Sequence, residues 1–147
     1  MSSNPKSLLL VFVQGLLLIY LFISGPVLPS SPVAGILELL GVILGLWSIW
    51  AMRITTIQIT ADVAPDSNLV TEGPYEFVRH PMYLAILLVC IGLIINSSTP
   101  MRIGTLLLLV ADFIVKGNYE EILLVKHFKK GYEDYQKKTK KFIPFIY

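Results

Sequence analysis

Four long runs of apolar residues, separated by short polar segments, dominate the chain. They cover approximately residues 7–23, 33–52, 81–95 and 101–115. A helix needs ~20 residues to cross a bilayer core of ~30 Å, so the first two runs are long enough and the last two are short. The polar turn 96–100 joins the two short runs and predicts a tight helical hairpin. This pattern predicts an all-α integral membrane bundle with about four transmembrane helices.

The first apolar run has some features of a secretory signal, because Lys6 precedes it and Ser-Pro-Val-Ala-Gly follows it. The run is longer than the ~7–15 apolar residues of a usual signal core. We therefore expect it to be retained as a helix.

The C-terminal part of the chain has a different pattern. Residues 118–136 mix charges with apolar side chains at helical spacing, which predicts an amphipathic cytoplasmic helix lying at the membrane surface. The last six residues, 142–147, are too apolar for a free tail, and we expect them to dock back onto the protein.

Composition supports a membrane protein with a single domain, residues 1–147. Hydrophobic residues make up 54% of the chain, more than a soluble domain of this size would carry. The net charge of +2 and the lack of a basic–aromatic pattern argue against a nucleic-acid partner. Cys90 is the only cysteine, so we expect a small buried hydrophobe and no cysteine-based metal site. His80 and His127 show no metal-ligand spacing, and we expect no metal.

Charge placement predicts the orientation of the helices. Of the 12 lysines and arginines, only Arg102 lies at the far side in a four-helix topology. The positive-inside rule therefore places both termini and the 53–79 loop, with its turn-forming residues, in the cytoplasm.

The densest polar cluster lies in residues 69–83, just before the third apolar run. Pro81 suits the first turn of a helix, where its missing N–H needs no partner. Arg79 and His80 then lie beside the positive end of that helix, which favours an anion such as a carboxylate. The alternative is structural: Arg79 reaches lipid headgroups and His80 only caps the helix.

A second cluster follows the fourth run. Lys116 and Glu120 are four residues apart and share a helix face, and Glu121 is adjacent. The two carboxylates are suited to holding an ammonium group, although a solvated helix face has the same composition. Asp112 and Glu38 lie inside apolar runs, where ionisable groups indicate function by default. Asp112 can pair with Lys116, whereas Glu38 has no local partner, and the roles of both stay open.

These motifs together resemble the isoprenylcysteine carboxyl methyltransferases and the related phospholipid methyltransferases. Gly73-Pro74-Tyr75-Glu76-Phe77-Val78-Arg79-His80-Pro81-Met82-Tyr83 is similar to the signature of the family. Lys116-x-x-x-Glu120-Glu121 looks like its Arg-x-x-x-Glu-Glu, and the stretch from His127 to Pro144 is similar to its C-terminal helix and closing segment. The resemblance covers residues 69–147, whereas residues 1–52 match only in being apolar.

The resemblance implies a helical membrane enzyme that uses S-adenosylmethionine (SAM) to methylate a lipophilic acceptor from the bilayer, with residues 69–147 as the catalytic core after two N-terminal transmembrane helices. It assigns Leu69, Val70, Gly73 and Tyr75 to the adenosine of the cofactor. It assigns Arg79, His80 and Tyr83 to the methionine part, and Glu120 to the amino group. Lys116, Glu121 and Arg79 are the catalytic candidates, and Lys116 stands where the family usually has an arginine, without the bidentate fork of a guanidinium.

The acceptor expected from the resemblance is an isoprenylcysteine-type carboxylate, which would be methylated on oxygen. The compact chain is typical of a prokaryotic member, so we expect a multi-pass protein of the plasma membrane. The sequence leaves open the identity of the acceptor, whether its reacting atom is O, N or S, and the oligomeric state. The rival hypotheses are a membrane sterol-type reductase that uses NADPH and a non-catalytic membrane scaffold.

Overall fold

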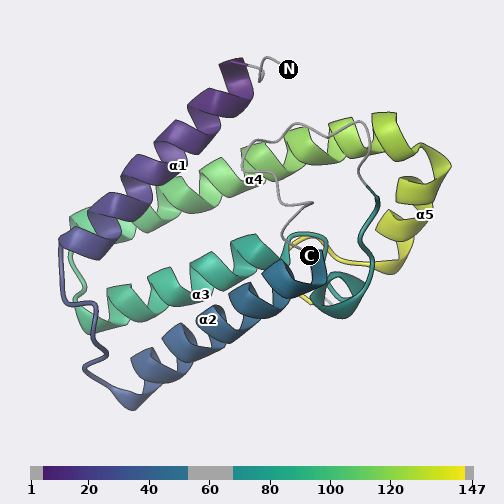
Figure 1. Ribbon diagram of the computed structural model, residues 1–147. Helices are drawn as coiled ribbons and strands as arrows, with labels where there is room; N and C mark the ends of the chain where they lie inside the picture. The colour runs from purple at the N-terminus through teal and green to yellow at the C-terminus, as the bar shows by residue number, and fades with distance from the viewer. Residues whose placement is uncertain (1–4, 53–67, 145–147) are drawn as a thin grey trace.

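The computed structural model describes residues 5–52 and 68–144, and within these ranges the regular structure is helical, with one isolated bridge between Val78 and Lys140. The all-α prediction is confirmed for this part of the chain. Residues 53–67 of the predicted turn-rich loop and the apolar residues 145–147 lie outside the described ranges. The elements, shown in Figure 1, are α1 (Pro5–Ile23), α2 (Pro32–Met52), the 3₁₀ helix η2 (Gly73–Glu76), α3 (Pro81–Asn96), α4 (Pro100–Phe128) and α5 (Lys130–Lys138).

Each of the four long helices begins at a proline: Pro5, Pro32, Pro81 or Pro100. Proline is favoured in the first turn because its fixed φ suits a helix and its missing N–H would have no intrahelical partner there. Thr99 adds a side-chain cap to α4, since its Oγ1 accepts from the backbone N–H of Arg102 at 3.3 Å. The sequence therefore sets the starts of these helices locally.

The four long helices form two pairs, with α2 lying along α3 and α1 lying along α4 (Figure 1). The pairs meet in an apolar core that includes Leu21, Cys90, Leu109 and Phe113. Cys90 is fully buried, as the sequence predicted. Only residues 97–99 separate α3 from α4, which confirms the tight hairpin.

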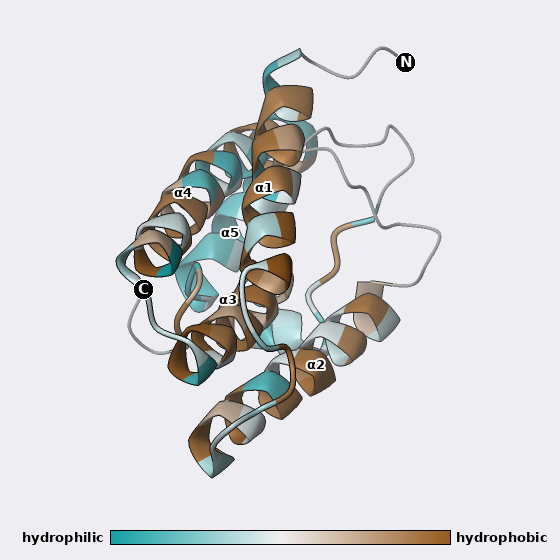
Figure 2. Cartoon of the chain, turned by 90° about the vertical axis from the view of Figure 1, so that its left-hand side faces the viewer, coloured by the Kyte–Doolittle hydropathy of each residue, from teal (hydrophilic) through white to brown (hydrophobic). Residues whose placement is uncertain are grey.

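The outer surfaces of α1 and α2 are apolar almost throughout (Figure 2). Both helices are long and hydrophobic enough to cross a membrane, and only 11% and 17% of their apolar windows are buried inside the molecule. The core helix of a soluble protein would bury most of such a surface. The exposed apolar faces therefore indicate that these helices lie in lipid.

The end of the bundle that contains the 97–99 turn is held by buried polar contacts. Arg102 is 1% exposed and donates to Ser24 Oγ at 3.0 Å and to the carbonyl of Leu93 at 2.8 Å. Glu38, which has no local partner in the sequence, accepts from Asn96 Nδ2 at 2.7 Å. These contacts join helices that are distant in the sequence and give both side chains hydrogen-bond partners within the bundle.

The C-terminal part differs from the single amphipathic helix predicted for residues 118–136. α4 continues as one helix of 29 residues to Phe128, and the chain then breaks at Lys129, whose φ is +51°. The separate helix α5 turns back and buries Tyr132 and Tyr135 against the protein. The aromatic face of α5 therefore packs on the site described below, and its largely hydrophilic outer face is exposed (Figure 2).

Candidate functional site

The segment that leads into α3 lies between the end of α2 and α5. Gly73 has φ +64°, a conformation that side chains other than glycine rarely adopt. A Cβ at this position would also lie 3.2 Å from Trp47 Nε1 on α2. Tyr75 is buried, and its backbone carbonyl accepts from the hydroxyl of Tyr135 at 2.6 Å. Glycine is therefore required where this turn passes closest to α2.

The C-terminal segment docks onto the residues before α3, and of the residues 142–147 predicted to dock, Phe142 is buried, whereas 145–147 lie outside the described ranges. The backbone N–H of Arg79 donates to the carbonyl of Lys140 at 2.8 Å, and that of His80 donates to the carbonyl of Lys141 at 3.1 Å. Phe142 is buried, and its ring centroid lies 5.4 Å from that of His80. These contacts bring Lys141 beside residues about sixty positions earlier.

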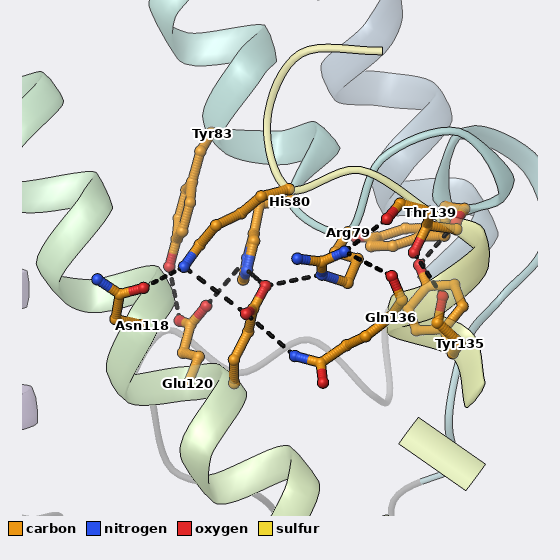
Figure 3. A network of polar contacts seen from close by, with 11 residues as sticks. Arg79, His80, Tyr83, Asn118, Glu120, Tyr135, Gln136 and Thr139 are labelled. Atoms are coloured by element: carbon orange, nitrogen blue, oxygen red, sulfur yellow. Dashed lines mark hydrogen bonds and ion pairs between the residues drawn. The ribbon is translucent and has the colours of Figure 1, made fainter. Parts of the chain in front are cut away.

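Arg79 and Glu121 form the central ion pair of the site. Arg79 Nε donates to Glu121 Oε1 at 2.8 Å, and its Nη1 donates to the carbonyls of Thr139 and Gln136 at 2.6 and 3.3 Å (Figure 3). The guanidinium thus joins α4, the end of α5 and the segment before α3. Arg79 points into the protein, which differs from the alternative in which it reaches lipid headgroups.

His80 lies between the two carboxylates. Its Nδ1 is 3.4 Å from Glu120 Oε2, and its Nε2 is 3.2 Å from Glu121 Oε1 (Figure 3). A carboxylate only accepts hydrogen bonds, so an imidazole that serves both must carry two protons. Burial lowers the pKa of His80, but the hydrogen bonds and charges of the two glutamates outweigh it, and the net pKa is raised. His80 is the N-cap residue of α3, but its side chain makes no cap bond to that helix.

Four donor side chains surround the carboxylate of Glu121. Besides Arg79 and His80, Gln136 Nε2 donates to its Oε2 at 3.1 Å, and Lys141 Nζ lies 3.7 Å from the same oxygen. Burial raises the pKa of Glu121, but hydrogen bonds from His80 and Arg79 and their charges outweigh it and lower the pKa to about 2. Glu121 is therefore a fixed anion that holds the surrounding cations together.

Glu120 is more open than Glu121, because its side chain is 19% exposed. Its Oε1 accepts from the hydroxyl of Tyr83 at 2.6 Å, and its Oε2 faces His80 (Figure 3). The ring of Tyr83 stacks on Phe113 at a centroid distance of 4.6 Å. Tyr83 thus connects the charged cluster to the apolar core.

Lys116 precedes Glu120 by one helical turn and extends toward α1. Its Nζ donates to Gln14 Oε1 on α1 at 3.0 Å and lies 5.4 Å from the centroid of the Tyr83 ring. Lys116 is only 4% exposed. The structure therefore brings Arg79, His80, Tyr83, Glu120 and Glu121 together, and it places Lys116 between Gln14 of α1 and the ring of Tyr83.

The predicted adenosine residues lie in η2 and in the segment that leads to it. Leu69 and Val70 are half-buried just before η2, and Gly73 and Tyr75 lie within it. The hydroxyl of Tyr75 points toward Met52 at the end of α2, with an O–S distance of 4.0 Å. Tyr75 therefore supports the turn from inside.

Sequence reasoning missed several members of the cluster. Lys141 was treated only as one of many cytoplasmic cations, yet it is buried and its Nζ donates to Asn118 as well as approaching Glu121. Gln136 and Gln14 were also not singled out. One signal was present: Lys141 directly precedes the apolar Phe142, and burial of that ring carries the lysine inward.

The arrangement has a defined electrostatic character. The cations Arg79, His80 and Lys141 face two carboxylates, which leaves one excess positive charge. An excess positive charge favours an anion such as a carboxylate, and a partly open carboxylate such as Glu120 can accept a hydrogen bond from a cation. A zwitterionic amino-acid group matches both features.

Comparison with known proteins identifies the family. The family model for phospholipid methyltransferases matches residues 30–131, which is more than half of the chain. A Schizosaccharomyces pombe protein named protein-S-isoprenylcysteine O-methyltransferase is 35% identical over 88 residues, covering 55% of this chain and 35% of its own length.

Two plant proteins show a similar relationship. The "Probable protein-S-isoprenylcysteine O-methyltransferase" of Oryza sativa subsp. indica is 32% identical over 80 residues, which is 54% of this chain and 42% of that protein. "Protein-S-isoprenylcysteine O-methyltransferase B" of Arabidopsis thaliana is 30% identical over 80 residues, with 54% and 41% covered. The matched stretch thus spans well under half of each relative, and the family itself is established by the family model: this chain belongs to the phospholipid methyltransferase family.

Proposed function

We propose that the protein transfers a methyl group from SAM to a lipid-like acceptor, and that the acceptor is an isoprenylcysteine-type carboxylate methylated on oxygen. The observation that carries this proposal is the convergence of Arg79, His80, Glu120 and Glu121 from segments forty residues apart in a chain of a methyltransferase family. The names of the relatives support the choice of acceptor. They do not favour the reductase or scaffold hypotheses.

The proposed setting is a bundle of four membrane spans, α1 to α4, with both termini and the site in the cytoplasm. The apolar exterior of α1 and α2 supports this arrangement. The 16 residues of α3 correspond to a length of ~24 Å at 1.5 Å per residue, which is short for a span. The site would then lie where the helices leave the membrane, within reach of a soluble cofactor and a lipid-soluble acceptor.

The residues of the site fit SAM in charge and position. The excess positive charge among Arg79, His80 and Lys141 suits the cofactor carboxylate, and Glu120 suits its ammonium group. We assign Leu69, Val70, Gly73 and Tyr75, in and just before η2, to the adenosine. When bound, SAM supplies a methyl group already activated on a sulfonium.

The residues of the chain would bind and orient the cofactor and the acceptor, and they would exclude water. A carboxylate acceptor needs no general base, because it reacts in its ionised form. Lys116 would hold that carboxylate, and the contacts of its buried ammonium group with Gln14 and the Tyr83 ring support this assignment. Arg79 and Glu121 would act by fixing the cofactor geometry.

The first test is SAM binding by calorimetry on detergent-purified protein, with NADPH as the comparison ligand. Glu120→Gln should weaken SAM binding roughly 10- to 100-fold, because a charge-assisted hydrogen bond is worth ~1.5–3 kcal/mol. Lys137→Ala is the control, because Lys137 is highly exposed and pairs only with Asp134 nearby. Equal SAM affinity in the wild type and Glu120→Gln would refute the assigned role. Binding of NADPH without SAM would refute the proposed function.

A further inference from the structure

A second polar group lies deeper than the charged cluster, inside the apolar part of the bundle. Asp112 and Lys116 of α4 lie one turn apart, and Lys116 donates to Gln14 of α1. The ammonium group of Lys116 also lies 5.4 Å from the centroid of the Tyr83 ring. These four side chains therefore form one continuous polar patch below Glu120.

Asp112 is the member that the interactions within the chain leave incomplete. It is only 7% exposed, and its Oδ2 has no hydrogen-bond partner among the residues that the structure describes. A buried carboxylate oxygen without a donor is costly, so such a group in a native protein calls for an explanation. A donor on a bound molecule would complete the coordination of Oδ2.

The order of charges along α4 restricts what that molecule is. Glu120, Lys116 and Asp112 follow one another at intervals of four residues, ~6 Å of helix rise each, and their charges alternate. If Glu120 takes the cofactor ammonium, the next group from the cofactor is the cation Lys116. The reacting group beside the cofactor is then anionic, and the hydrogen-bond donor lies one turn deeper.

We propose that Asp112 recognises an N–H group next to the acceptor carboxylate, as in an amide-linked cysteine, and that Gln14 positions Lys116 for the carboxylate. This inference rests on the proposed function and adds a specificity determinant to it. Methyl transfer to a carboxylate oxygen forms a C–O bond as the C–S bond breaks and releases no proton. Asp112 therefore serves recognition and not proton transfer. A reacting amine would need the reverse order, with the carboxylate closer to the cofactor than the cation.

The test compares two acceptors that differ by a single group. N-acetyl-S-farnesyl-cysteine carries the N–H, and its 2-acetoxy analogue carries an ester oxygen in that position with the same shape. We expect wild-type kcat/KM to favour the amide by roughly tenfold or more, because a site built for a hydrogen bond rejects the analogue that lacks it. In Asp112→Ala the ratio should fall toward one, while Asp112→Asn, which keeps a side-chain oxygen, should retain part of the preference.

Two further variants separate recognition from folding. Gln14→Leu should raise KM for both acceptors alike and leave their ratio unchanged, because Gln14 acts through Lys116. Glu38→Gln is the matched control for loss of a carboxylate inside the bundle, since its side-chain oxygen still accepts from Asn96, and it should leave the ratio unchanged. SAM affinity measured by calorimetry should stay the same in all these variants.

The outcomes distinguish this inference from the proposed function. Equal use of amide and ester by a wild type that binds SAM and methylates both would overturn the role of Asp112 and leave the proposed function intact. Methylation of the amine of phosphatidylethanolamine in vesicles, with neither carboxylate used, would overturn both the recognition role of Asp112 and the proposed carboxylate acceptor, while methyl transfer from SAM would stand. Absence of SAM binding in folded wild type would remove both.

Discussion

At the scale of single residues, His80 is the most constrained side chain of the site. Both ring nitrogens face carboxylates, and the ring lies nearly parallel to that of Tyr83, with centroids 5.3 Å apart. The imidazolium thus neutralises part of the charge of two adjacent glutamates in a buried place. This makes the protonation of one histidine a contributor to the stability of the site.

This arrangement predicts a stability that depends on pH. A raised folded-state pKa for His80 gives a contribution that is fully present below the unfolded value of 6.5 and is lost as pH rises through the folded pKa. The free energy of unfolding should therefore fall by up to ~1.4 kcal/mol per pH unit between pH 6.5 and the folded-state pKa. This loss should be seen as a lower thermal midpoint of the wild type in detergent as pH rises above 6.5. His80→Gln should be less stable at pH 6 and should lack this slope.

The contribution of Glu121 to stability depends on pH in the opposite sense, because it is lost at low pH. Its pKa is lowered to about 2, so its contribution is present above the unfolded value of 4.5 and is lost as pH falls toward 2. Thermal scans from pH 5 to 8.5 therefore stay above the range in which the contribution of Glu121 is lost, and comparison with His80→Gln gives the effect of His80. A flat wild-type profile above pH 6.5 would contradict the charged imidazole.

At the scale of elements, the close approach of α2 and α3 depends on glycine. A Cβ at Gly41 of α2 would lie 2.7 Å from the backbone carbonyl oxygen of Ala85 on α3 and 2.7 Å from a methyl group of Val89. The backbone of α3 cannot yield as a flexible side chain would. The pair of helices that supports Gly73 and the turn before α3 therefore needs a small residue here.

Gly41→Ala should destabilise the protein by ~1–3 kcal/mol through overpacking, seen as a lower thermal midpoint. Gly104→Ala is the matched control, because a Cβ at Gly104 of α4 meets nothing within 4 Å. That control should be neutral or should stabilise by up to ~1 kcal/mol, since alanine is the better helix former. Equal effects of the two substitutions would show that α2 and α3 are less closely packed than described.

At the scale of the whole molecule, charge and hydropathy divide the structure into two ends. The 97–99 turn and the loop after α1 lie at one end, and α5 and the charged cluster lie at the other (Figure 1). The exposed lysines of α5 belong to the second end. This division predicts that the two ends face opposite sides of the membrane.

Cysteine labelling tests this topology in a Cys90→Ala background. In right-side-out membrane vesicles, an impermeant maleimide should label Ser98→Cys at once and should label Lys137→Cys only after permeabilisation. Both positions are exposed, so local burial does not limit the reaction. Labelling of both positions from the same side would contradict the proposed bundle.

Much of the fold could be predicted from the sequence because its signals are local. Apolar runs of about 20 residues and prolines at helix starts depend on neighbouring residues, so the four long helices and the α3–α4 hairpin were predictable. The break at Lys129 was not, because charged and apolar residues continue at helical spacing across it. The separate α5 exists because burying Tyr132 and Tyr135 on the site is favoured over continuing α4.

The candidate site, like the fold, could be predicted from the sequence only in part. Arg79, His80, Glu120 and Glu121 were found as two local clusters, because their charges are unusual beside apolar runs and their motifs resemble those of a family. Only the tertiary structure decided three further features of the site. His80 bridges both glutamates, Lys141 enters from the C-terminal segment, and Lys116 donates to Gln14. The sequence by itself determined which residues carry charge at the end of each apolar run. Their pairing depends on the crossing of α1, α3, α4 and the closing segment in space, which brings together groups separated by up to 102 positions.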